Sequence, residues 1–174
     1  MNTEGYKKEG HTKNIIKSLK KAVSIGHHPR VFIILGFPHE TRSDIFQTLA
    51  FVARTALTGI NDINVFLFTP YPGSELFKKL QEEGKIGKLD DAYFDSLFAQ
   101  SNMTVRKSYC SALGWWELFT YRVFGMMMFY ILGYFRYPRR IMRLARCLLM
   151  GQPQNILERR IVDFARLLWK TKTR

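Results

Sequence analysis

Cysteine is scarce in this chain of 174 residues, and the shortage excludes two classes of protein. The two cysteines, Cys110 and Cys147, form neither a C-x-x-C pair nor a zinc-finger spacing. A disulfide scaffold and a cysteine-based zinc site are therefore excluded, and a reduced, cytoplasmic setting is expected. The polar segment 1–9 has no apolar signal-peptide core, so a secretory leader is not expected.

Acidic residues are also few, since 14 Asp and Glu stand against 27 Lys and Arg, giving a net charge of +13. Such a charge favours an anionic partner: nucleic acid, an acidic membrane surface or an acidic protein. From residue 136 to 174, eleven Lys and Arg face two acids, a local net of +9. Nucleic acid is the least favoured partner because no helix-turn-helix, zinc or RNA-recognition signature is present.

Long uncharged apolar runs are lacking as well. No stretch reaches about 18 uncharged apolar residues, so a conventional transmembrane helix is not expected. The longest candidate, 123–135, is bounded by Arg122 and Arg136 and predicts a buried or interfacial helix.

The chain does contain a strand–loop–helix pattern that occurs twice in succession. The apolar runs 31–35 and 63–68 are each followed by a loop rich in glycine and proline and then by a helical pattern, and 12–25 is helical in spacing. The order α-β-α-β-α over 12–84 predicts two neighbouring parallel strands. Their loops would share the carboxyl edge where α/β folds bind ligands. The unbroken apolar character of 31–35 predicts a strand covered on both faces.

Local signals predict where the helices begin and end. Thr41 and Asp44 resemble a capping box, and Ser74 is a good N-cap with Glu75 in the first turn. Glycine ends a helix readily, so Gly84 is the expected end of the helix after Ser74.

Beyond about residue 88 the pattern is helical throughout, over 93–98, 115–134, 139–149 and from Pro153 onward. On the wheel of 139–149, arginines gather on one side and apolar residues on the other. The arginines are Arg139, Arg140, Arg143 and Arg146. A basic amphipathic helix beside an aromatic, apolar one is typical of an interfacial membrane anchor. A helical lid with a solvated basic face explains the pattern as well.

The two loops resemble a known family. Gly36-Phe37-Pro38-His39-Glu40-Thr41 and Thr69-Pro70-Tyr71-Pro72-Gly73-Ser74 are similar to the turns after the fifth and sixth strands of radical S-adenosylmethionine (radical SAM) enzymes. More specifically, the two loops resemble those of the class that often carries a cobalamin-binding domain ahead of the radical domain. It covers roughly residues 1–86, and His39 stands where that class usually has glycine.

The resemblance implies an α/β fold: a partial (β/α) TIM-like barrel, the second half of a radical SAM barrel, over 1–88, and an all-helical, basic extension over 89–174. It implies S-adenosylmethionine and a [4Fe–4S] cluster for the parent enzyme, and it is compatible with cobalamin. Ile34 and Gly36 would lie near the adenine, with backbone contacts from 68–70. The implied cofactor-binding positions are Ile34, Gly36, Phe37, Pro38, Glu40, Phe68, Thr69 and Pro70.

Some roles stay open. Glu40 would bind a polar part of the cofactor or, as the favoured alternative, sit beside a helix N-terminus whose dipole stabilises it. The histidines His27, His28 and His39 have no partner at ligand spacing and are expected to be solvated. No catalytic residue and no metal ligand can be assigned from the sequence.

One departure from the family is serious. The C-x-x-x-C-x-x-C motif that binds the cluster is absent, and such clusters need thiolate ligands. We therefore expect a fragment of an enzyme for radical modification or methylation of a small or lipid-like substrate, inactive without an N-terminal half or split partner chain. The alternative is a non-enzymatic membrane-associated or partner-binding remnant. The expected location is the cytoplasm or the inner face of the cell membrane.

Overall fold

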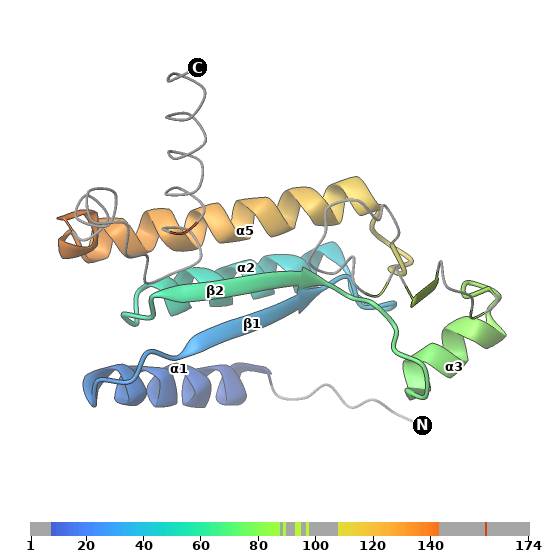
Figure 1. The fold of residues 1–174 in the computed structure, drawn as a ribbon, viewed down its shortest axis with the longest axis horizontal. Coiled ribbons are helices and arrows are strands. Elements are labelled where there is room, and N and C mark those ends of the chain that lie inside the picture. Colours follow the sequence, from blue (N-terminus) through green and yellow to red (C-terminus); the bar gives the residue numbers. More distant parts are fainter. Residues whose placement is uncertain are drawn as a thin grey trace, which may run out of the picture. The chain divides into compact units, whose positions relative to one another are not determined.

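The computed structural model describes residues 8–87, 89, 93–94, 97, 108–142 and 159. In these residues the chain is mixed α/β. The elements are α1 (Lys8–Ser24), β1 (Arg30–Leu35), α2 (Arg42–Ala56), β2 (Asp62–Leu67), α3 (Glu75–Glu82) and α5 (Trp115–Arg136). The strands β1 and β2 lie side by side and point the same way, forming a two-stranded parallel sheet (Figure 1). The predicted order and the parallel pairing are confirmed, whereas closure into a barrel stays a prediction.

The described residues fall into two compact units. The first unit takes its described residues from Met1–Val31, Phe51–Ile63 and Met128–Arg174, and the second takes them from Phe32–Ala50 and Asn64–Met127. Every cofactor-binding position implied by the family resemblance therefore belongs to the second unit.

The predicted helix ends are confirmed by their caps. The Thr41 hydroxyl donates to Asp44 Oδ2 at 2.8 Å, and the Asp44 N–H donates back to Thr41 Oγ1 at 3.3 Å. The Ser74 hydroxyl oxygen accepts the Phe77 N–H at 3.2 Å at the start of α3. At the other end of α3, Gly84 takes a left-handed conformation with φ +68°. These contacts satisfy helix-end groups that would otherwise lack partners.

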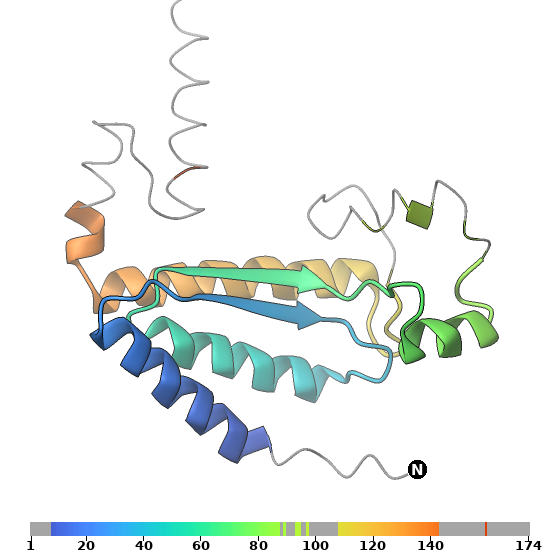
Figure 2. The same ribbon diagram turned by 60° about the horizontal axis from the view of Figure 1, so that its bottom comes forward.

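The prediction that 31–35 is covered on both faces is wrong. Burial along β1 alternates, with Ile33 and Leu35 buried and Phe32 and Ile34 exposed by 60% and 47%. In the second unit α2 and α5 run along the strands and bury one side of them (Figure 2). Because side chains alternate across a strand, one row of β1 stays open.

Polar contacts organise the first unit around the loop between α2 and β2. The Tyr130 hydroxyl donates to Asp62 Oδ1 at 2.8 Å, and Arg30 Nε lies 3.0 Å from Asp62 Oδ2. Burial, and then this hydrogen bond, raises the pKa of Tyr130. The Tyr137 hydroxyl donates to the Leu57 carbonyl at 3.2 Å, so α5 and the segment after it bind the end of α2.

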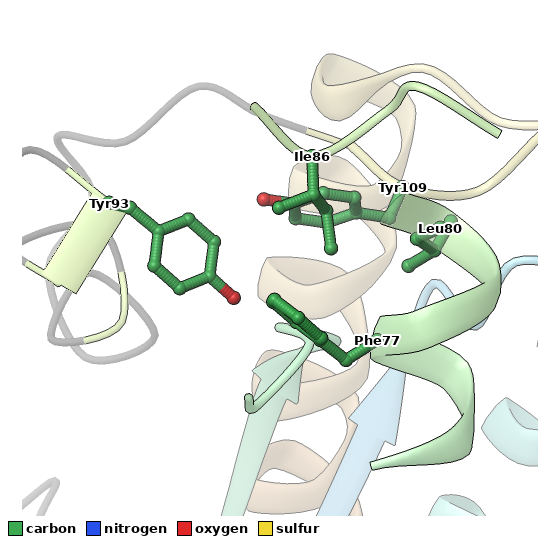
Figure 3. Close-up of a cluster of buried hydrophobic side chains, with 5 residues drawn as sticks. All are labelled: Phe77, Leu80, Ile86, Tyr93 and Tyr109. Atoms are coloured by element: carbon green, nitrogen blue, oxygen red, sulfur yellow. The ribbon is translucent and has the colours of Figure 1, made fainter. Parts of the chain in front are cut away.

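A cluster of buried side chains anchors α3 in the second unit. Its members are Phe77, Leu80, Ile86, Tyr93 and Tyr109 (Figure 3). The Tyr93 ring stands edge-on to Phe77 with centroids 6.0 Å apart, and in Figure 3 its hydroxyl points toward the other members. Aromatic pairs favour this geometry, so residues from the segment after α3 hold that helix in place.

Part of the predicted helical extension lies outside the described residues. Pro138 opens a helical turn that is described as far as Met142, as the sequence predicts. The remainder of 139–149, with Arg143, Arg146 and Cys147, is not among the described residues. The division into 1–88 and 89–174 stays a prediction.

Candidate ligand-binding edge of the sheet

The turn after β1 is held by its own acidic residue. Glu40 Oε2 accepts the backbone N–H of Gly36 at 2.5 Å and that of Phe37 at 3.2 Å. The carboxylate thus binds two donors that an incoming ligand would otherwise meet. In this geometry Glu40 shapes the turn, and Thr41 caps the helix that follows.

Gly36 is required by packing as well as by conformation. Its φ is +87°, in the left-handed region that favours glycine. A Cβ at this position would lie 2.8 Å from Leu118 Cδ1, a side chain of α5. The glycine that resembles the family motif is therefore needed by the fold itself.

The turn after β2 is fixed by neighbours on both sides. The Phe68 N–H donates to the Leu35 carbonyl at 2.7 Å, and the Tyr93 hydroxyl donates to the Pro70 carbonyl at 2.5 Å. Pro70 is fully buried, and Thr69 is half-buried. Burial raises the pKa of Tyr93 to about 12, so its hydroxyl remains a donor at neutral pH.

The two turns touch through their aromatic rings. Phe37 and Phe68 have ring centroids 4.8 Å apart, and Tyr109 stands edge-on to Phe68 at 6.4 Å. Phe37 is 36% exposed and Ile34, three residues earlier, is 47% exposed, whereas Pro38 is buried. The structure therefore brings together the two loops that the sequence predicted would share one edge.

The segment 108–111 completes this edge, and sequence analysis did not identify it. The Ser111 N–H donates to the Pro38 carbonyl at 3.2 Å, and the Cys110 thiol donates to the Glu40 carbonyl at 3.2 Å. No spacing in the sequence links these residues to the first turn, about 70 positions earlier. The only feature of the sequence that could have indicated this segment is the aromatic residue Tyr109 among the small residues Ser108, Cys110 and Ser111.

The open surface of the edge is apolar. Glu40 accepts N–H groups of its own turn and the Pro70 carbonyl accepts from Tyr93, while Ile34, Phe37 and Phe68 leave ring and aliphatic surface accessible. We name this surface, formed by Ile34, Phe37 and Phe68, the apolar edge. Ring faces and aliphatic side chains are the groups that usually contact a flat aromatic ligand.

An iron–sulfur cluster does not fit the residues present. Across the described ranges, no three His, Cys, Asp or Glu side chains form a group that could hold a metal ion. His27, His28 and His39 are exposed, and His28 Nδ1 lies 3.4 Å from Asn61 Nδ2. Cys110 is the free cysteine of the described part and stands alone.

No protein-family model, curated protein or solved structure matches this chain.

Proposed function

We propose that the second unit supplies one wall of an S-adenosylmethionine site in a radical SAM-type enzyme. The apolar edge would contact the adenine. The enzyme would carry out radical modification or methylation, and its substrate would be a small or lipid-like molecule. The cluster-binding part would come from another segment or another chain.

The observation that carries this proposal is the open row of β1. Phe32 and Ile34 are large apolar side chains with about half or more of their surface in water, next to buried Ile33 and Leu35. A strand with such a run is usually covered on both faces in parallel sheets. Further chain packed on this side would cover the row and enclose the apolar edge.

The ligands that an iron–sulfur cluster needs also indicate that this chain contacts the adenine while another segment or chain holds the cluster. A cluster and S-adenosylmethionine together supply radical chemistry in the family resembled, and the cluster is held by thiolates. Since this chain carries two cysteines far apart, its own residues would orient the adenine and exclude water but not hold iron. Cobalamin, which the same resemblance allows, would likewise be held elsewhere.

A titration with S-adenosylhomocysteine, followed by backbone amide NMR, tests the proposal on the full chain. We expect shifts at Gly36, Phe37 and Phe68 with a dissociation constant on the order of 1 mM, since only one wall is present. Ile34→Thr should weaken the shifts, because it removes an aliphatic contact from the apolar edge.

The matched control is Ile25→Thr, which makes the same change at an exposed isoleucine after α1. It should leave the titration unchanged. Two results would count against the proposal. One is chemical-shift changes that lie away from the two turns, and the other is no change at a ligand concentration roughly ten times the expected dissociation constant.

A further inference from the structure

The helix α5 carries an exposed apolar face along its whole length. Five large side chains are each between 54% and 89% exposed, and they recur at helical spacing on one continuous helix. They are Trp116, Phe124, Met127, Ile131 and Phe135. At 100° per residue they fall within an arc of roughly 100°, which we name the α5 stripe.

One charged residue, Glu117, falls at the edge of this arc, where its Oε1 accepts from Arg42 Nε at 2.7 Å. Thr120 falls within the same arc, and its hydroxyl donates to the Trp116 carbonyl at 2.8 Å, so its polar group is satisfied within the helix. The charged residue in the middle of α5, Arg122, lies on a different face, where burial lowers its pKa. Apart from Glu117 and Thr120, whose polar groups are both bound, the arc carries apolar or aromatic side chains.

The opposite face of α5 is bound to protein. Leu118 and Phe129 are buried, and a Cβ at Gly125 would lie 2.9 Å from Leu49 Cδ2 of α2. In length and composition α5 could cross a bilayer, and 28% of its most apolar window is buried in the protein. Crossing would carry α2, with exposed Gln47 and Arg54, into hydrocarbon, where charged groups are costly.

Positive charge continues beyond the stripe. Arg136 is the last residue of α5 and Arg139 lies in the helical turn that follows. Both are exposed, and the chain from 136 to 174 has a net charge of +9. Basic residues near an apolar helix face attract anionic lipid headgroups, and helices of this composition lie in the plane of the interface.

We infer that α5 lies along the surface of an anionic lipid bilayer, with the α5 stripe at the boundary of the acyl chains. Arg136 and Arg139 then contact the headgroups. This inference rests on α5 and the charge that follows it, and does not depend on the S-adenosylmethionine site.

Co-sedimentation of the full chain with vesicles tests it. The chain should bind vesicles of phosphatidylcholine with phosphatidylglycerol far more strongly than pure phosphatidylcholine. Raising the salt from about 0.05 M to about 0.5 M should weaken the binding markedly, because salt screens exposed charges. Absence of binding to anionic vesicles at low salt overturns the inference, and binding that salt leaves unchanged overturns the role of the arginines.

Variants locate the binding face. Phe124→Gln, Met127→Gln and Ile131→Gln together should lower the vesicle partition coefficient at least roughly tenfold, since apolar burial drives interfacial binding. Glutamine suits helices and these positions are exposed, so the fold should persist. The matched control changes three exposed apolar residues elsewhere to glutamine: Ile15, Ile25 and Leu57. Equal losses in both triple variants overturn the assignment.

Fluorescence provides a second readout that does not depend on the triple variant. Trp116 is 64% exposed at the start of the stripe. Lipids brominated on the acyl chains should quench it on binding, and Trp116→Phe should remove most of that quenching. Quenching that is unchanged in Trp116→Phe contradicts insertion of the stripe.

Discussion

At the scale of single residues, Gly36 carries two constraints that can be separated. We predict that Gly36→Ala lowers the free energy of unfolding by about 1–2 kcal/mol for the left-handed conformation and by a further 1–3 kcal/mol or so for crowding against Leu118. Urea unfolding measures the loss.

Gly73→Ala is the control for that prediction. Gly73 has φ +91°, and a Cβ there would meet nothing within 4 Å, so this variant isolates the conformational part. Equal losses at the two positions would show that the contact with Leu118 is relieved without cost.

The buried pair of Tyr130 and Asp62 gives a pH-dependent prediction. Because the folded pKa of Tyr130 is raised above its usual value of about 10, its contribution to stability is present below pH 10 or so and is lost as pH rises further. We predict that Tyr130→Phe lowers the free energy of unfolding by about 1–3 kcal/mol at neutral pH, since Asp62 loses a donor.

The same variant should also flatten the fall in stability between about pH 9 and pH 11, because the titrating hydroxyl is gone. Urea unfolding across that range measures both effects. An alkaline slope identical to that of the wild type would assign the fall to other groups.

At the scale of elements, local signals predicted more than long-range ones. The caps at Thr41 and Ser74 and the apolar run of β1 placed helices and strands within a residue or two, because these interactions lie within one turn. The one-sided burial of β1 could not be predicted, since an apolar run looks the same whether one face or both are covered. For the site, the sequence predicted that the two loops share one edge, but neither the contact of Phe37 with Phe68 nor the approach of Cys110.

Capping of α3 offers a direct test at this scale. Ser74→Ala should lower the free energy of unfolding by about 1 kcal/mol, because the Phe77 N–H loses its acceptor. Amide hydrogen exchange in α3 should rise as the helix frays. The control is Ser24→Ala, whose hydroxyl donates to the Lys21 carbonyl at an exposed helix end, and it should change stability by less than about 0.5 kcal/mol.

At the scale of the whole molecule, the open row of β1 predicts opposite results at adjacent positions. Ile33→Thr should lower the free energy of unfolding by about 2 kcal/mol or more, because it leaves a cavity and a buried hydroxyl at a position that is 8% exposed. Ile34→Thr, on the row that is open to solvent, should change stability by less than about 0.5 kcal/mol.

Ile34→Thr should also reduce self-association in analytical ultracentrifugation, since it removes exposed apolar surface next to Phe32. Equal destabilisation by the two substitutions would mean that both rows of β1 are covered. In that case β1 would have no open face, and the proposal that this chain is a fragment would lose its main support.

The most direct test of the central claim is the nucleotide sequence immediately upstream of the Met1 codon. We predict coding sequence for a C-x-x-x-C-x-x-C motif, in frame, one frameshift away or in the adjoining gene, because the second unit lacks the thiolates that its proposed partner half would supply. An unrelated upstream region behind a genuine start signal, with no such motif in the adjoining gene, would contradict the claim. The membrane-binding role of α5 would then be the function to pursue.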